Sequence, residues 1–225
     1  MDFEQGLRNL SIQFVPFMMA VVFHEFAHGF VANRWGDPTA KDAGRLTLNP
    51  APHVDPLGTL LFPVLMMVTG MNLLFGWARP VPIDPTRFKK YRLGLFWVSF
   101  AGPGMNFILA LVSGAGFAAI QSWMPRDFYL YEPLLGMTIA SVTVNYALGI
   151  FNLLPLPPLD GSKMIQSFLS LRATLKYEAL AQYSFFILLA LLWTGALSFL
   201  SWPIVMARNL TLFGMAQLFG LSDLG

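Results

Sequence analysis

Two histidines and a glutamate lie close together in the sequence His-Glu-Phe-Ala-His, residues 24–28. In an α-helix, residues four apart share one face, so His24 and His28 can both offer a ring nitrogen to one metal ion. Glu25 projects differently and can contact a metal-bound water instead, as a general base must. The alternative is a buried histidine pair that hydrogen-bonds to neighbouring helices, but three ionisable side chains in an apolar helix are costly without a function.

A catalytic zinc ion needs a third protein ligand and an open fourth position. The chain has no cysteine, so His, Asp or Glu must supply that ligand. Outside residues 24–28, the only acidic residue inside or directly ending an apolar run is Asp160, which follows a segment broken by three prolines. An unwound segment leading to an aspartate can bring a carboxylate to an internal ion, although a solvated helix cap would show the same pattern.

The composition requires a membrane environment for these residues. The chain of 225 residues is 56% hydrophobic and only 12% charged, with a mean hydropathy of +0.58. Soluble domains carry roughly a quarter charged residues, so this chain is expected to be an integral membrane protein in contact with the lipid bilayer. The formal net charge of +2 is too small for a nucleic-acid-binding surface, so no nucleic-acid partner is expected.

Uncharged runs predict an all-α polytopic fold with about five to six membrane segments, one of them re-entrant. The five longer runs cover residues 9–33, 56–78, 93–125, 133–159 and 179–207. The run 9–33 is interrupted only by Glu25 and the two histidines. A sixth, shorter run covers residues 209–222, where a helix starting at Pro203 would either span or lie along the interface. The connections are too short for a separate soluble domain, so residues 1–225 are expected to form one membrane domain, with core motifs in 23–165 and C-terminal helices in 178–221.

Three motifs together resemble the site-2 protease family of intramembrane zinc metalloproteases. They are His-Glu-Phe-Ala-His, the sequence A-G-P-G-M-N at residues 101–106, and N-L-L-P-L-P-P-L-D-G at residues 152–161. The resemblance implies one Zn²⁺ per chain, held by His24, His28 and Asp160, with Glu25 as the catalytic base. It corresponds to a short form of the family that lacks an inserted PDZ domain and an appended CBS pair.

Charge placement predicts how the chain crosses the membrane. Residues 77–92 and 161–178 are rich in Lys and Arg and are expected to be cytoplasmic, whereas residues 122–133 belong on the other side. His24 lies ~22 Å along a helix that starts near Asn9. An extracytoplasmic N-terminus is therefore expected, because it brings His24 to the depth of Asp160. Residues 56–78 must then re-enter, although their length would also suffice for a span.

Residues 76–83 contain two prolines, which exclude a helix and favour a sheet edge. A small β-strand or loop is therefore expected near the active site. Arg79, Pro80 and Val81 are predicted to bind substrate, since an edge strand could hold an unwound substrate by β-augmentation, and the family resemblance implies the same role. An ordinary tight loop is the alternative.

Three further polar residues are candidates for the site. Asn106 and Asn152 are amides in apolar segments and fall within the family motifs, so both are predicted to bind substrate or to stabilise the oxyanion. An interhelical hydrogen bond is the alternative for each. His53 is expected to be a solvated loop histidine, with a gating or supporting role as the alternative, because a fourth zinc ligand would close the site.

These residues predict an intramembrane zinc endopeptidase that cleaves transmembrane protein substrates in regulated intramembrane proteolysis. A prokaryotic plasma membrane is expected, with the active site toward the cytoplasm. The main alternative is a metal-ion transporter that uses His24, His28 and Asp160 as a transit site; it predicts metal flux and no need for Glu25. A silent scaffold with structural zinc is less suitable, because structural zinc sites usually have four ligands.

Overall fold

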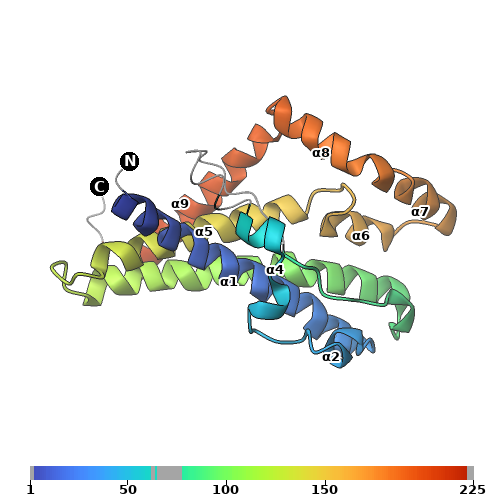
Figure 1. Ribbon diagram of the computed structural model, residues 1–225, viewed down its shortest axis with the longest axis horizontal. Coiled ribbons are helices and arrows are strands. Elements are labelled where there is room, and N and C mark those ends of the chain that lie inside the picture. The colour runs from blue at the N-terminus through green and yellow to red at the C-terminus, as the bar shows by residue number, and fades with distance from the viewer. Residues whose placement is uncertain (1–2, 62–63, 65–77, 222–225) are drawn as a thin grey trace.

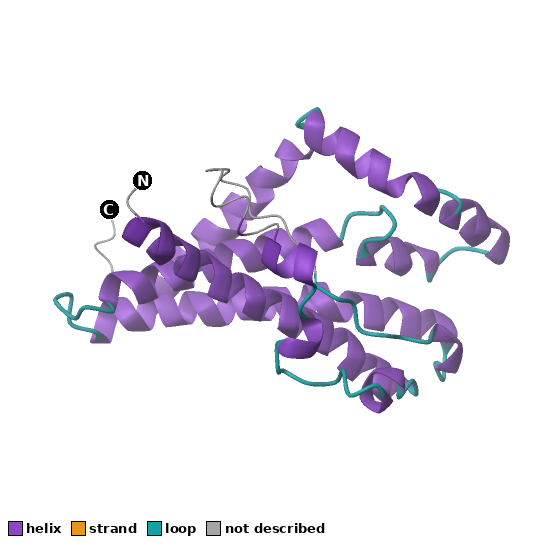
Figure 2. Cartoon of the chain, viewed as in Figure 1, coloured by secondary structure: helices purple, strands orange, loops and turns teal. Residues whose placement is uncertain are grey.

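The computed structural model describes residues 3–61, 64 and 78–221. All regular secondary structure in these residues is helical (Figure 2), which confirms the predicted all-α polytopic membrane fold. Within these described residues, four helical segments are long and apolar enough to cross a membrane: Ser11–Trp35, Tyr91–Trp123, Tyr131–Asn152 and Ala196–Leu218. The predicted segment 56–78 lies mostly outside the described residues.

Three long helices form the centre of the molecule. They are α1 (Phe3–Trp35), α4 (Tyr91–Trp123) and α5 (Tyr131–Asn152), which pack against one another along the long axis (Figure 1). Each is apolar over most of its length, as a segment in contact with lipid must be. Each is also helical, because a helix makes its backbone hydrogen bonds within the segment. Helix α4 also contacts α6 (Asp160–Gln166) and α9 (Ser201–Leu218), and α9 packs against α5 as well.

The C-terminal region departs from the prediction. The run 179–207 was expected to form one membrane segment, but the structure divides it into the 3-10 helix η4 (Ala181–Tyr183), α8 (Ser184–Trp193) and the 3-10 helix η5 (Ala196–Leu200). The break lies at Gly195, whose φ of +69° is a left-handed conformation that glycine adopts easily. The last candidate span therefore begins at Ala196 and continues through α9. Helix α8 and the preceding α7 (Leu171–Glu178) extend away from the central helices (Figure 1).

The ends of the helices are arranged as the predicted topology requires. The beginning of α1 lies at the same end of the bundle as the loop between α4 and α5, and the start of α4 and helices α6 and α7 lie at the other end (Figure 1). Residues 122–133 and the two basic regions thus lie at opposite ends. Because α1 ends where α4 begins, the chain between them returns to the end from which it started. Whether residues 56–78 re-enter or span stays a prediction.

Shorter elements connect α1 to α4. They are α2 (Thr39–Asp42), the 3-10 helix η1 (Ala51–His53), a single π-helical turn η2 (Pro56–Leu61) and the 3-10 helix η3 (Pro85–Arg87). The connection between α5 and α6 contains Pro155, Pro157 and Pro158, which cannot donate backbone hydrogen bonds. Helix α5 therefore ends at Asn152, earlier than the expected limit at residue 159, and α6 begins at Asp160 itself.

Candidate zinc centre

The structure brings His24, His28 and Asp160 together. Nε2 of each histidine lies 3.2 Å from Oδ2 of Asp160, and the two Nε2 atoms are 3.0 Å apart. The three potential ligand atoms lie within 4.8 Å of one another, and all three side chains are largely buried. The histidines come from successive turns of α1 and the aspartate from the first residue of α6, so this contact joins two elements that are distant in sequence.

The other ring nitrogen of each histidine is held by an acceptor. Nδ1 of His28 lies 2.6 Å from the backbone oxygen of Val98, which can only accept, so Nδ1 carries the hydrogen. Nδ1 of His24 lies 2.6 Å from Oδ1 of Asn106, whose amide nitrogen donates to the backbone oxygen of Ala20. The amide of Asn106 therefore presents its oxygen to His24. Both histidines consequently have a lone pair on Nε2, which is the form that binds a metal.

The convergence of these atoms fits a cation. Two Nε2 lone pairs and one carboxylate oxygen face one another, and with these tautomers none of the three supplies a hydrogen to the others. Such a set is repulsive unless a positive ion lies among it, and nitrogen and oxygen ligands of this kind suit zinc. Two histidines and one carboxylate also match the three-ligand pattern of catalytic zinc sites, which leaves one position open.

Two glycines make the necessary space. A Cβ atom on Gly102 of α4 would lie 2.6 Å from Nε2 of His24 and would also collide with Nε2 of His28. A Cβ atom on Gly161 would lie 2.6 Å from the backbone oxygen of Leu154 and even closer to that of Leu153. Gly102 thus keeps α4 clear of the ligand atoms, and Gly161 allows α6 to begin directly against the end of the preceding loop.

Glu25 is fixed by the segment formed by residues 78–84. Oε2 of Glu25 accepts a hydrogen bond of 2.7 Å from the backbone N–H of Val81. Hydrogen bonds to charged groups are stronger than neutral ones, so this contact restrains the carboxylate. The predicted base and the predicted substrate-binding segment are thus in direct contact.

The 78–84 segment is anchored on both sides of Val81. The N–H of Arg79 donates to the backbone oxygen of His53 at 2.9 Å, and the N–H of Asp84 donates to Oδ2 of Asp37 at 2.7 Å. Nη2 of Arg45 donates to the carbonyl oxygen of Arg79 at 2.8 Å and to that of Pro80 at 3.4 Å. Asp37 is fully buried, so the hydrogen bond that it accepts from Asp84 is shielded from solvent.

The predicted edge strand needs correction for the described part of 76–83. Residues 78–84 have no regular secondary structure and no partner strand, while Gly76 and Trp77 lie outside the described residues. Residues before a proline prefer extended conformations, and successive residues of an extended chain direct their N–H and C=O groups to opposite edges. Arg79 and Val81 use their N–H groups on protein acceptors, so the other edge belongs to Pro80 and Pro82. That edge has no N–H donors, and one of its two carbonyl oxygens, that of Pro80, already lies 3.4 Å from Nη2 of Arg45.

The remaining predicted residues occupy different positions. Asn106 is completely buried and bonded to His24, so its geometry favours support of that histidine and gives no support to a substrate contact. Asn152 is the last residue of α5, is half-buried, and donates to the carbonyl oxygen of Leu148 at 3.0 Å. Arg79 and Pro80 are exposed, whereas the side chain of Val81 is buried.

His53 is buried, not solvated as expected. Its Nε2 donates to the backbone oxygen of Thr47 at 2.9 Å, and its own carbonyl oxygen receives the N–H of Arg79. It is not part of the ligand group among the described residues. The structure thus favours the alternative of a supporting role, through the 78–84 segment.

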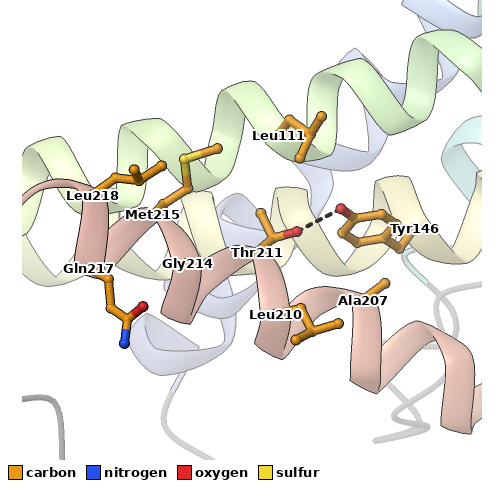
Figure 3. A pocket seen from close by; sticks show the side chains of 9 residues that line it. All are labelled: Leu111, Tyr146, Ala207, Leu210, Thr211, Gly214, Met215, Gln217 and Leu218. Carbon is orange, nitrogen blue, oxygen red and sulfur yellow. Dashed lines mark hydrogen bonds between the residues drawn. The ribbon is translucent and has the colours of Figure 1, made fainter.

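A separate groove of about 640 Å³ lies between α4, α5 and α9 (Figure 3). Tyr146 and Thr211 form a hydrogen bond of 2.6 Å in its wall, and the other lining side chains, such as Leu111 and Leu210, are mostly apolar. None of the histidines, Glu25 or Asp160 lines it. It is therefore not the candidate centre.

Comparison with known proteins agrees with this site. The model of "Peptidase family M50" matches residues 133–195, which include Asp160. The chain is 37% identical over 194 residues to "Putative zinc metalloprotease YwhC" of Bacillus subtilis (strain 168), covering 86% of this chain and 85% of the relative. The chain belongs to peptidase family M50, the site-2 protease family.

A second relative extends the comparison. "Putative zinc metalloprotease Rip2" of Mycolicibacterium smegmatis is 31% identical over 181 residues, covering 80% of this chain and 66% of the relative. No solved structure matches. As an M50 protein, the chain is a zinc metalloprotease and an integral membrane protein, which confirms the predicted family, enzyme class and cofactor.

Proposed function

We propose that this M50 protein is an intramembrane endopeptidase that hydrolyses peptide bonds within or near the transmembrane helices of protein substrates. The observation that carries the proposal is the convergence of His24, His28 and Asp160 beside Glu25 on a helix able to span a membrane. A hydrolytic centre at that position can reach substrate segments that soluble proteases cannot.

In this proposal, Nε2 of His24, Nε2 of His28 and a carboxylate oxygen of Asp160 hold the zinc. When bound, zinc polarises a carbonyl group and lowers the pKa of a water ligand to about 7. Glu25 accepts a proton from the attacking water and later delivers it to the leaving amine. Since Oε2 of Glu25 receives the N–H of Val81, we assign the proton transfer to Oε1.

The 78–84 segment is the proposed docking position for the substrate backbone, and Asn152 is a candidate to contact it near the end of α5. A helical peptide bond has its carbonyl hydrogen-bonded, so cleavage requires an unwound substrate. An unwound substrate would donate its own N–H groups to the carbonyl oxygen of Pro82 and to that of Pro80, where it would share the acceptor with the long 3.4 Å contact from Arg45. Contact with one edge of an irregular segment thus replaces the predicted pairing with an edge β-strand.

The proposed location is a prokaryotic plasma membrane, with the zinc centre toward the cytoplasm. The support is the position of α6 and the start of α4, at the end of the bundle where the basic residues gather (Figure 1).

The test is zinc content and cleavage of reconstituted single-span substrates by the wild type, Glu25→Gln and Asp160→Ala. We expect Glu25→Gln to bind zinc normally and to lose cleavage, and Asp160→Ala to lose both. Glu178→Gln is a matched control, because Glu178 is an exposed acid on α7. Cleavage by Glu25→Gln at the wild-type rate would contradict the proposed mechanism. Zinc flux into liposomes without cleavage would favour the metal-ion transporter.

A further inference from the structure

We propose that Asn145 is a positioning residue of the zinc centre. It orients the side-chain amide of Asn106, and through that amide it determines which nitrogen of His24 carries the hydrogen. This inference rests on the proposed role of His24 as a zinc ligand. It adds a residue from α5, a helix that contributes no proposed ligand atom.

The three side chains form a buried relay across α1, α4 and α5. Nδ1 of His24 lies 2.6 Å from Oδ1 of Asn106, and Nδ2 of Asn106 donates to Oδ1 of Asn145 at 2.8 Å. Nδ2 of Asn145 donates to the backbone oxygen of Ser141 at 2.9 Å. Asn106 and Asn145 are 0% and 1% exposed, so water does not compete for these bonds.

The direction of the relay follows from its fixed end. The carbonyl oxygen of Ser141 can only accept, so it requires the amide nitrogen of Asn145 on its side. The oxygen of Asn145 then faces Asn106 and requires a donor there, which places the oxygen of Asn106 against His24. Because Oδ1 of Asn106 is an acceptor, the ring hydrogen of His24 must be on Nδ1, which leaves the lone pair on Nε2 for the metal.

A second acceptor for Asn106 does not make Asn145 redundant. The backbone oxygen of Ala20 lies 3.2 Å from Nδ2 of Asn106, and this contact is longer than the one to Asn145. Nδ2 of Asn106 has two hydrogens; one is donated to the backbone oxygen of Ala20 and the other to Oδ1 of Asn145. Without Asn145, one buried hydrogen lacks its partner, which raises the free energy of this orientation relative to the flipped one. A flipped amide would donate to Nδ1 of His24 and move the ring hydrogen to Nε2, where it blocks the metal.

The test is the Kd for zinc of purified full-length protein, measured by competition with a chelating indicator. The variants are Asn145→Leu, Asn106→Leu and the double variant, because leucine has the same branching at Cγ as asparagine, although it is larger, and has no polar side-chain atom. Loss of a supporting hydrogen bond to a metal ligand typically costs about 10- to 100-fold in metal affinity. We expect about tenfold weaker zinc binding in each single variant and no further loss in the double variant, since both act through one relay.

Thr143→Val is the matched control. Thr143 is on the same helix, and its hydroxyl donates to the carbonyl oxygen of Ile139 within α5 at 2.8 Å. Its zinc affinity should equal that of the wild type. An unchanged Kd in Asn145→Leu, or losses that add in the double variant, would overturn the inference. Equal zinc binding by the wild type and His24→Ala would instead overturn the proposed zinc site.

If Asn145→Leu does not fold, a second pair of variants decides. Asn145→Asp, in its protonated form, keeps an acceptor toward Asn106 and an O–H donor toward the carbonyl oxygen of Ser141, whereas Asn145→Ala has neither. We expect zinc affinity close to that of the wild type for Asn145→Asp and about tenfold weaker binding for Asn145→Ala. Equal affinities for the two variants would contradict the relay.

Discussion

The backbone nitrogen of Val81 lies 2.7 Å from Oε2 of Glu25, although 56 residues separate them in the sequence. This contact connects α1 to the segment proposed to receive substrate. The orientation of the proposed base therefore depends on a main-chain group far from residues 24–28 in the sequence.

Val81→Pro removes that N–H and should lower kcat without changing zinc content. A hydrogen bond to a charged group contributes about 1.5–3 kcal/mol, so we expect a decrease on the order of tenfold or more. The measurement is cleavage of a reconstituted substrate together with zinc analysis. Val81→Ala is the control, because it keeps the N–H while it loses side-chain packing. Equal rates in the two variants would show that the hydrogen bond does not matter.

Gly102→Ala should abolish zinc binding, because the added methyl group would collide with Nε2 of both His24 and His28. Gly116→Ala, on the same helix, should keep normal zinc content, since its methyl group would meet the nearest atom, Cγ2 of Thr138, at an ordinary 3.5 Å. Metal analysis of the two purified proteins checks the prediction. Full zinc occupancy in Gly102→Ala would mean that α4 does not limit the space at the ligands.

Removal of zinc with a chelator should lower the Tm of the protein in detergent, because three acceptors from α1 and α6 then face one another without a cation. Zinc at about a thousand times its Kd would stabilise the fold by about 4 kcal/mol. Differential scanning fluorimetry with and without chelator measures the shift. In His24→Ala the shift should be absent, and a shift of equal size there would point to another zinc site.

The proposed topology can be tested without background labelling, because the chain has no cysteine. Lys90→Cys and Asp127→Cys place single thiols at exposed positions at opposite ends of the bundle. A membrane-impermeant maleimide should label Asp127→Cys in intact cells and Lys90→Cys only after permeabilisation, because basic loops face the cytoplasm. The reverse pattern would place the zinc centre on the other side.

The group formed by His24, His28 and Asp160 could be predicted because each residue is marked by its immediate sequence neighbours. The i, i+4 spacing puts His24 and His28 on one helix face, and Asp160 stands out as an acid that ends an apolar run. The contact between Glu25 and Val81 could not be predicted, because it depends on how the loop from α1 to α4 folds back. The burial of His53 has the same cause.

The relay through Asn106 and Asn145 shows a second limit. A polar residue in an apolar helix indicates an interior position, but the sequence does not say which neighbouring helix it faces. The division of 179–207 was missed for a different reason, since apolar runs do not mark their own breaks. Gly195 was the available signal, because glycine is the residue that most easily adopts a positive φ.

The donor-free edge of the 78–84 segment also affects how copies of the protease meet. Exposed extended edges usually invite pairing with their own kind, which leads to aggregation. Two edges that both present only the carbonyl oxygens of Pro80 and Pro82 have no hydrogen to share and cannot template one another. The edge proposed to bind substrate therefore does not promote pairing between two copies of the protein.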